Sequence, residues 1–262
     1  MKLDLAGRTA VVTGASRGIG LEVTRALVRE GVRIAAGARH ASAELTALSD
    51  DGDVLVVLDD LTSSDGSRAL VEQAVERFGG VDLLINNVGG VRPRTAGFVE
   101  VGDADWQWAL EVNLLSAVRA TRAAVPHLVR RAPSAIVTVC SVNATLPDPG
   151  VIDYSAAKAA LRSFCKSLSK ELGPSGVRVN TVSPGPVETD LWLGAGGVAE
   201  TIGQAQGADP ASIRAAAVAG TPTGRFSRPS EVAQVVLLLA SETAGNVTGT
   251  DVVIDGGMVT TV

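Results

Sequence analysis

Short apolar runs rich in β-branched residues alternate along this chain with longer segments of helical periodicity. The runs are TAVVTG, VRIAAGA, DVLVVLD, VDLLIN, AIVTVCS, VRVNTVS and DVVIDGG, and helical patterns cover residues 18–30, 41–49, 64–78, 104–131 and 154–172. Strands separated by helices pair in parallel through right-handed crossovers. The alternation therefore predicts an α/β fold, a doubly wound parallel sheet of about seven strands with helices on both faces.

The composition agrees with such a sheet. Hydrophobic residues make up 46% of the 262 residues and aromatic residues only 3%, so Ala, Val, Leu and Ile must build the core. These residues suit strands that are buried on both faces. Because the length is that of one large α/β domain and nothing in the composition marks a boundary, we expect a single domain over residues 1–262.

Charge and motif content exclude several classes of function. A formal net charge of −5 and a pI near 5.1 provide no basic field for nucleic acid or anionic lipid. The first residues lack the pattern of a signal peptide, and no window approaches the roughly 18 apolar residues of a membrane span, so we expect a cytoplasmic protein. Cys140, Cys165, His40 and His127 are each isolated, which predicts small core cysteines and no metal site.

Three glycines follow the first apolar run, in TGASRGIG at residues 13–20. Gly14 permits a tight turn, Gly18 allows backbone N–H groups to approach a phosphate, and Gly20 removes a side chain where the helix packs on the sheet. The following helix directs its N-terminus at an anion such as a pyrophosphate. A glycine-rich turn alone occurs at many strand-to-helix junctions, but its place after the first strand of an alternating pattern favours dinucleotide binding.

The spacing Gly-x-x-x-Gly-x-Gly resembles that of the short-chain dehydrogenase/reductase family. Further motifs in the family's order extend the resemblance over nearly the whole chain: NNVGG at 86–90, Asn113, Ser141, YSAAK at 154–158, SPGPVET at 183–189 and VTGTDVVIDGG at 247–257. Val88 stands where the family usually has Ala, which concerns local packing rather than chemistry. The resemblance, which is to 3-oxoacyl reductase-like members, implies a Rossmann-like fold, one dinucleotide-binding catalytic domain and a cofactor that transfers a hydride.

Tyr154 and Lys158 lie four residues apart on a predicted helix, so their side chains share one face. A nearby ammonium favours the phenolate and brings the phenol pKa, about 10 when free, toward the working pH of a general acid/base. The alternative is an ordinary surface pair. The resemblance implies that Tyr154 protonates the substrate oxygen, that Lys158 also hydrogen-bonds the nicotinamide ribose, that Ser141 holds the carbonyl and that Asn113 positions a water.

The resemblance also implies a set of cofactor-binding residues. Asp60 with Leu61 is expected at the adenine and Asn87 under its ribose, while Val187 and Thr189 are expected at the nicotinamide carboxamide. A solvated Asp60 at a strand end is the alternative. The full predicted set is Gly14, Ser16, Arg17, Gly18, Ile19, Gly20, Arg39, Asp60, Leu61, Asn87, Gly89, Tyr154, Lys158, Pro184, Gly185, Val187 and Thr189.

Arg39 indicates which nicotinamide the protein uses. The acidic residue that binds a ribose 2′-hydroxyl is expected about 20 residues beyond the glycine turn, where this chain has Ala38 followed by Arg39. An arginine can instead bind a 2′-phosphate, and Arg17 in the glycine turn is a candidate partner. The alternative is two solvated arginines. We therefore predict NADP(H) in preference to NAD(H).

The segment 188–220 breaks the alternation. It is rich in Gly and Ala and has no clear strand, and we interpret it as a substrate lid. Trp192 in this segment is predicted either to face a bulky substrate or to pack the lid onto the domain. Arg92 and Arg94 follow NNVGG and either bind a carboxylate or the phosphate of a carrier arm, or form a solvated loop.

Trp106 and Trp108 lie two residues apart on a predicted helix and cannot point the same way. We expect one of them in the core and the other at an interface. The resemblance implies a homo-oligomer, either a dimer or a tetramer.

Together these observations predict an NADP(H)-dependent oxidoreductase that transfers a hydride between nicotinamide and a ketone or secondary alcohol. Its catalytic set is Asn113, Ser141, Tyr154 and Lys158. A 3-oxoacyl thioester reductase and a ketoreductase for cyclic ketones both fit the composition of the lid. An NAD-linked alcohol dehydrogenase of the same family is an alternative. A nicotinamide-binding sensor without catalysis is another, which the presence of all four residues disfavours.

Overall fold

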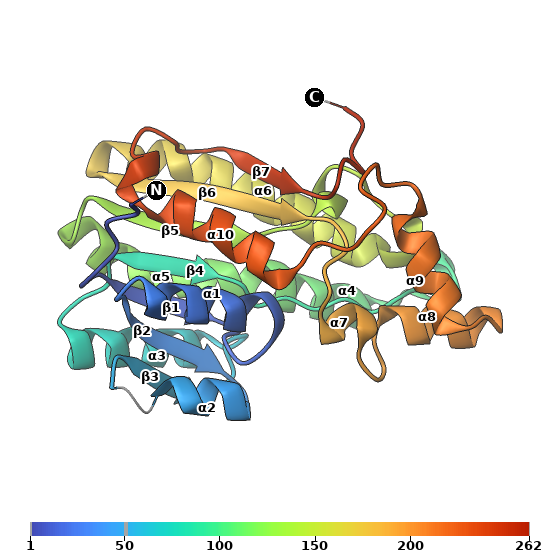
Figure 1. Ribbon diagram of the computed structural model, residues 1–262, viewed down its shortest axis with the longest axis horizontal. Helices are drawn as coiled ribbons and strands as arrows, with labels where there is room; N and C mark the ends of the chain where they lie inside the picture. The colour runs from blue at the N-terminus through green and yellow to red at the C-terminus, as the bar shows by residue number, and fades with distance from the viewer. Residues whose placement is uncertain (1, 50–51, 262) are drawn as a thin grey trace.

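The computed structural model describes residues 2–49 and 52–261 and contains a seven-stranded parallel sheet (Figure 1). The strands are β1 (Thr9–Thr13), β2 (Arg33–Ala38), β3 (Val54–Leu58), β4 (Leu83–Asn86), β5 (Ser134–Val139), β6 (Val177–Pro184) and β7 (Asp251–Ile254). Their spatial order is β3-β2-β1-β4-β5-β6-β7, which confirms the predicted doubly wound fold. The order reverses between β1 and β4, and ligands of such sheets bind beyond the carboxyl ends of the strands at that point.

Helices cover both faces of this sheet. They are α1 (Gly18–Arg29), α2 (Ala43–Ser49), α3 (Ser64–Phe78), α4 (Asp103–Leu110), α5 (Ser116–Arg130), α6 (Ile152–Leu172), α7 (Asp190–Leu193), α8 (Val198–Gln206), α9 (Pro210–Ala219) and α10 (Pro229–Ala240). α1 and α10 bury apolar side chains against one face, and α3, α5 and α6 bury theirs against the other. Val12 belongs to the first core and Val11 to the second, because successive strand side chains point to opposite faces. This double burial explains the uninterrupted apolar runs.

The helix predicted over residues 104–131 is interrupted. α4 ends at Leu110, a π-helical turn covers Glu111–Leu115, and α5 begins at Ser116. The N–H of Ser116 donates to the carbonyl of Glu111, five residues back, and its hydroxyl donates to the carbonyl of Val112 at 2.6 Å. Such turns occur mostly at functional sites. Asn113, predicted as catalytic, lies in the middle of this one.

The predicted lid contains the short helices α7, α8 and α9, which its Gly and Ala content did not reveal. α7 and α9 have no buried residues, and α8 buries only Val198, Ala199 and Gly203. In Figure 1 these helices lie beyond the carboxyl ends of the strands, toward which the arrows point. The lid segment is therefore adjacent to the edge of the sheet where ligands bind, and it is lightly packed.

The expectation that one of Trp106 and Trp108 lies in the core is wrong, because both are partly exposed. α4 buries only the small residue Ala109, so the helix places neither indole inside. The cysteines, in contrast, are buried free thiols as predicted. Within residues 2–49 and 52–261, no helix combines the length and apolar character needed to cross a membrane.

Candidate active site

Most of the predicted functional residues lie just beyond the carboxyl ends of the strands. These segments are 14–20 after β1, Arg39 after β2, Asp60 and Leu61 after β3, Asn87 and Gly89 after β4, Ser141 after β5, and 184–189 at the end of β6. Because the strands are parallel, all these ends meet at one edge of the sheet. The structure thus brings together residues from six separate parts of the sequence.

The glycine turn between β1 and α1 has the geometry of an anion site. Gly14 and Gly18 have φ angles of +69° and +55°, and a Cβ on Gly20 would lie 2.1 Å from the Gly14 carbonyl oxygen. Asn87 secures the turn, since its Nδ2 donates to the carbonyls of Thr13 at 3.1 Å and of Gly14 at 2.9 Å. No side chain caps the first turn of α1, which leaves its N–H groups to bind an anion. These features fit the pyrophosphate of a dinucleotide.

Lys158 and Asn113 approach each other across Gly89. Lys158 is 3% exposed, and its Nζ donates to the Val139 carbonyl at 3.1 Å and lies 5.7 Å from the centroid of the Tyr154 ring. A Cβ on Gly89 would lie 3.4 Å from this Nζ and 3.2 Å from Oδ1 of Asn113. A glycine at this position therefore leaves the ammonium accessible from the loop after β4.

Burial dominates the acid–base properties of this pair. Burial raises the pKa of Tyr154 to about 12, and the hydroxyl of Ser141 offsets part of that rise. Burial also lowers the pKa of Lys158. The Lys158 ammonium, which the sequence predicts to lower the phenol pKa, does not offset the cost of desolvating the phenolate. Tyr154 is therefore protonated at neutral pH, which is the form that donates a proton.

The Asn113 side chain joins the π-helical turn to the loop after β4. Its Nδ2 donates to the carbonyls of Gly90 at 2.8 Å and of Ala109 at 3.1 Å, and its Oδ1 accepts from the N–H of Gly90 at 3.0 Å. Both amide hydrogens are thus engaged within the protein. The Asn113 side chain therefore has no free N–H to donate to a water, and a water at this turn would have to donate its own hydrogen bond to an oxygen atom. The role of Asn113 in positioning a water stays a prediction.

Asn143 is a neighbour of the catalytic set that sequence reasoning missed. The Ser141 hydroxyl donates to Oδ1 of Asn143 and accepts from its N–H, both at 3.2 Å. These contacts restrict the rotamer of Ser141 at the end of β5. The position of Asn143, two residues after the serine and before the predicted helix, was the available signal.

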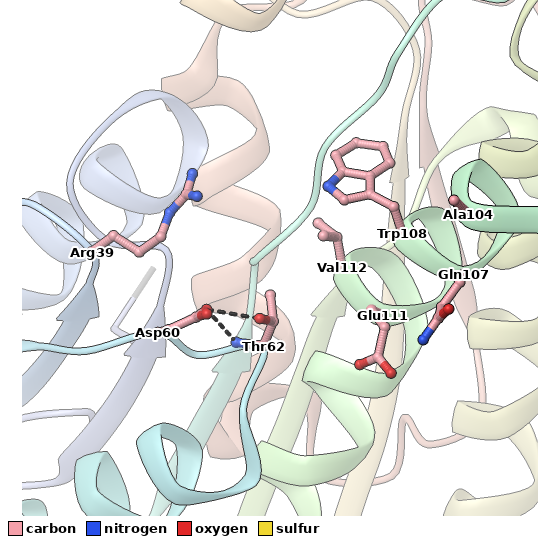
Figure 2. Close-up of a pocket in the computed structure, with 8 residues that line it drawn as sticks. All are labelled: Arg39, Asp60, Thr62, Ala104, Gln107, Trp108, Glu111 and Val112. Carbon is pink, nitrogen blue, oxygen red and sulfur yellow. Dashed lines mark hydrogen bonds between the residues drawn. The ribbon is translucent and has the colours of Figure 1, made fainter.

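Beside this set, a groove separates the loops after β2 and β3 from α4 and the π-helical turn. Figure 2 shows Arg39 with Asp60 on one wall and Trp108 with Glu111 on the other. The volume of the groove is about 410 Å³. The lining residues are Arg39, Asp60, Thr62, Ala104, Gln107, Trp108, Glu111 and Val112. Hydrogen bonds from Thr62, at 2.8 and 3.0 Å, lower the pKa of Asp60, and the charge of Arg39 adds to this effect.

Leu61, Val187 and Thr189, which are also predicted to contact the cofactor, differ in their burial and in their neighbours. The Leu61 side chain is 4% exposed and belongs to the core under α3, so it does not line the groove. Val187 is buried and pairs with Ser227. A Cβ on Gly18 would lie 3.2 Å from Cγ2 of Thr189, so the loop after β6 lies beside the glycine turn. This proximity is needed if both segments contact one ligand, as the sequence predicts.

The structure gives contacts for Trp192, Arg92 and Arg94, whose roles the sequence left open. Trp192 packs edge-on against Phe226, with ring centroids 5.5 Å apart and an interplanar angle of 78°, which favours a role in packing the lid. Arg92 lies over the Trp108 ring at 3.8 Å. Arg94 forms ion pairs with two carboxylates of the protein, so it is not the free cation that binding a substrate carboxylate would need.

A family model described as enoyl-(acyl carrier protein) reductase matches residues 14–259. The chain belongs to the short-chain dehydrogenase/reductase family. It is 34% identical to the 3-oxoacyl-[acyl-carrier-protein] reductase of Thermotoga maritima over 98% of this chain and 100% of that protein. It is 35% identical to the cis-4-hydroxycyclohexanecarboxylate dehydrogenase of Sinomonas cyclohexanicum over 96% of each.

Among solved structures, the L-sorbose reductase of Gluconobacter frateurii, in complex with NADPH and L-sorbose, superposes with a TM-score of 0.91. That match covers 100% of both chains at 32% sequence identity. As a short-chain dehydrogenase/reductase, this protein is an oxidoreductase that acts on a carbonyl or alcohol substrate with a nicotinamide cofactor.

Proposed function

We propose that this protein is an NADP(H)-dependent ketone reductase. The observation that carries the proposal is the convergence of Ser141, Tyr154, Lys158 and Asn113 at one edge of the sheet. A protonated phenol in a desolvated site suits the reduction of a carbonyl, in which the enzyme must supply a proton. NADP(H) is the cofactor that favours this direction in cells.

In the proposed reaction, a nicotinamide cofactor held by the glycine turn at residues 14–20 and by Lys158 would supply a hydride to the carbonyl carbon. The Ser141 hydroxyl donates a hydrogen bond to the carbonyl oxygen, and Tyr154 transfers its phenolic proton to that oxygen. Lys158, held by the carbonyl of Val139, stabilises the phenolate that remains. The products are a secondary alcohol and the oxidised nicotinamide.

Arg39 supports NADP(H) over NAD(H). It stands at the end of β2 on the rim of the groove, directly after Ala38, so no carboxylate occupies the place of a ribose 2′-hydroxyl acceptor. Arg17 and Arg39 are both exposed, and neither forms an ion pair within residues 2–49 and 52–261. Two exposed guanidinium groups that form no ion pair in this part of the chain suit a 2′-phosphate.

For the substrate, we propose a 3-oxoacyl thioester or a cyclic ketone. The named activities of the relatives in Thermotoga maritima and Sinomonas cyclohexanicum support these two classes equally. The homo-oligomer and the cytoplasmic location remain predictions, and light scattering after size exclusion tests the first.

The test is the loss of NADPH absorbance when the purified protein meets a short 3-oxoacyl thioester or a cyclic ketone. We expect turnover with at least one of them, and a rate about 10²- to 10⁴-fold lower for Tyr154→Phe, which lacks the acid. NADPH binding without turnover on either substrate or on the corresponding alcohols would favour the sensor function instead.

A second measurement tests the cofactor. Arg39→Ala should weaken NADPH binding by roughly 10- to 100-fold, the size of a lost hydrogen bond to a charged group, and leave NADH binding nearly unchanged. An unchanged ratio of the two affinities would show that the protein does not select NADP(H) through Arg39.

A further inference from the structure

We propose that Arg94 is a positioning residue that holds the N-terminal end of α6, and with it Tyr154, against the loop after β4 and the start of α4. The proposal rests on the proposed function, because it concerns the placement of the proton donor. Arg94 does not approach the reacting atoms through any contact in the structure. It acts through the carboxylate of Asp153, the residue that precedes Tyr154.

One guanidinium joins two helices in this arrangement. Nε and Nη2 of Arg94 both donate to Oδ2 of Asp153, the former at 3.1 Å, and Nη1 donates to Oδ1 of Asp105 at 2.8 Å. Asp153 lies in the first turn of α6, and Asp105 lies in the first turn of α4. The planar fork of arginine is suited to such a double contact, whereas a lysine presents a single point charge.

The backbone of Arg94 adds another connection to the same region. Its N–H donates to the carbonyl of Gly150 at 2.7 Å, and the Asp148 side chain accepts from the N–H of Gly150 at 2.7 Å. The segment that enters α6 is therefore tied to the loop after β4 at Gly150 as well as at Asp153. Arg94 connects the three segments that carry Gly89, Asn113 and the Tyr154–Lys158 pair.

Burial distinguishes this contact from an ordinary surface ion pair. The Arg94 side chain is 11% exposed and that of Asp153 only 1%, whereas Arg68, which pairs with Asp65 and Glu72 on α3, is 60% exposed. Exposed pairs contribute little, but removing one partner of a buried pair leaves an uncompensated charge. Oδ1 of Asp153 already lacks a hydrogen-bond partner in the structure, so this carboxylate depends on Arg94 for compensation.

The position of the phenol must be exact for proton transfer, since a misplacement of 1 Å can cost about 10²-fold in rate. α6 begins at Ile152, so Tyr154 stands in a first turn that no side chain caps. Helix ends fray unless they are held. The ion pair with Arg94 supplies that restraint directly beside the catalytic residue.

The first test compares Arg94→Gln with wild type in NADPH-dependent ketone reduction. We expect kcat to fall roughly 10- to 100-fold with KM for NADPH changed less than about twofold, because the glycine turn and Arg39 are untouched. Arg94→Lys should recover part of the loss, since it restores charge but not the fork. Arg68→Gln is the matched control, and its kcat should equal that of wild type. An unchanged kcat in Arg94→Gln would overturn the proposal.

The double variant Arg94→Gln/Asp153→Asn separates positioning from the cost of an unpaired buried charge. The double variant removes the buried charge of Asp153, so its thermal stability should be closer to that of wild type than the stability of Arg94→Gln is. Its kcat should stay at least about tenfold low, because the connection to α4 is still absent. If kcat recovers together with stability, Arg94 serves only to neutralise Asp153 and the proposal is wrong.

Hydrogen exchange provides a readout that does not depend on turnover. Amides of residues 150–158 should exchange faster in Arg94→Gln and in the double variant, and those of residues 161–172 should not. Should wild type show no reductase activity while this pattern holds, the proposed function fails and the restraint on α6 stands. If the amides of residues 150–158 exchange in the variants at the same rates as in wild type, Arg94 does not restrain the start of α6 and the proposal is wrong.

Discussion

Helix α6, which carries the proposed catalytic pair, and the helices α7 to α9 of the predicted lid are held in different ways: α6 runs alongside the sheet, whereas α7 to α9 lie beyond the carboxyl ends of the strands (Figure 1). Much of one side of α6 is buried, including Lys158, Leu161 and Cys165, whereas α7 and α9 bury no residue. Elements with few buried contacts open at low free energy, and ligand-binding lids are drawn from them. The proposed proton donor thus lies on a firmly packed helix, and the predicted lid is lightly packed.

The difference originates in composition. α6 has Leu161, Cys165 and Leu172 on its buried side, and these belong to the same core as Val177 and Val179 of β6. The segment 188–220 is rich in Gly and Ala, which bury little apolar area. Polar groups of α6 are also bonded to the sheet, as the contact from Lys158 to the Val139 carbonyl shows.

The largest expected effect concerns the phenol of Tyr154 on α6. Alcohol oxidation needs the Tyr154 phenolate, and a pKa raised to about 12 makes the phenolate scarce at neutral pH. The oxidation rate at saturating substrates should therefore rise about tenfold per pH unit from pH 7 to pH 10, without a plateau. Initial rates across this range, with Tyr154→Phe as a blank, provide the measurement. A plateau below pH 8 would mean that Lys158 lowers the phenol pKa after all.

The reductive rate should have the opposite dependence. Tyr154 carries its proton throughout the neutral range, so its protonation does not limit reduction there. Burial lowers the pKa of Lys158, so the ammonium loses its charge at a lower pH than an exposed lysine does. We expect the rate to be flat near neutrality and to decline on the alkaline side.

Leu161→Ala tests how firmly α6 is held. Leu161 is 1% exposed in the core between α6 and the sheet. Its truncation should cost about 3 kcal/mol of stability through lost burial and a cavity, and lower Tm by roughly 6 to 12 °C. Thermal unfolding followed by circular dichroism measures this shift. A loss below about 1 kcal/mol would contradict the description of α6 as the fixed element.

Much of the site was predictable because its motifs are local. Gly14, Gly18 and Gly20 are needed where one strand enters one helix, and Tyr154 with Lys158 is separated by a single helical turn. Residue patterns of this kind report backbone geometry directly. The seven strands followed from the same reasoning, since burial on both faces leaves an uninterrupted apolar run.

The remaining features depend on contacts between distant parts of the chain. The pair of Arg94 and Asp153 spans 59 residues, and its formation requires the finished fold. The π-helical turn around Asn113 contains no Gly or Pro that would mark an interruption between α4 and α5, so the sequence did not reveal it. The raised pKa of Tyr154 reflects burial, which a sequence motif does not report.

Trp192→Ala examines the largest contact of the lid. The indole packs on Phe226, and aromatic pairs contribute about 0.5 to 1.5 kcal/mol beyond burial. We expect kcat/KM to fall roughly 2- to 10-fold, equally for a small and a bulky ketone, because the lid closes less well on both. A loss confined to the bulky ketone would show that Trp192 contacts the substrate, and the lid would then be a recognition surface.

The smallest effect is expected for Ile202→Ala in α8, the lid counterpart of Leu161→Ala. Ile202 is only half-buried and lies outside both cores, so its truncation removes little buried area and leaves no enclosed cavity. A loss of about 1 kcal/mol or less, equivalent to roughly 2 to 4 °C in Tm, should accompany an unchanged kcat. The same thermal unfolding and rate measurements apply to both variants. A loss as large as that of Leu161→Ala would mean that the lid is packed as firmly as the catalytic helix, and substrate entry would then require a different opening.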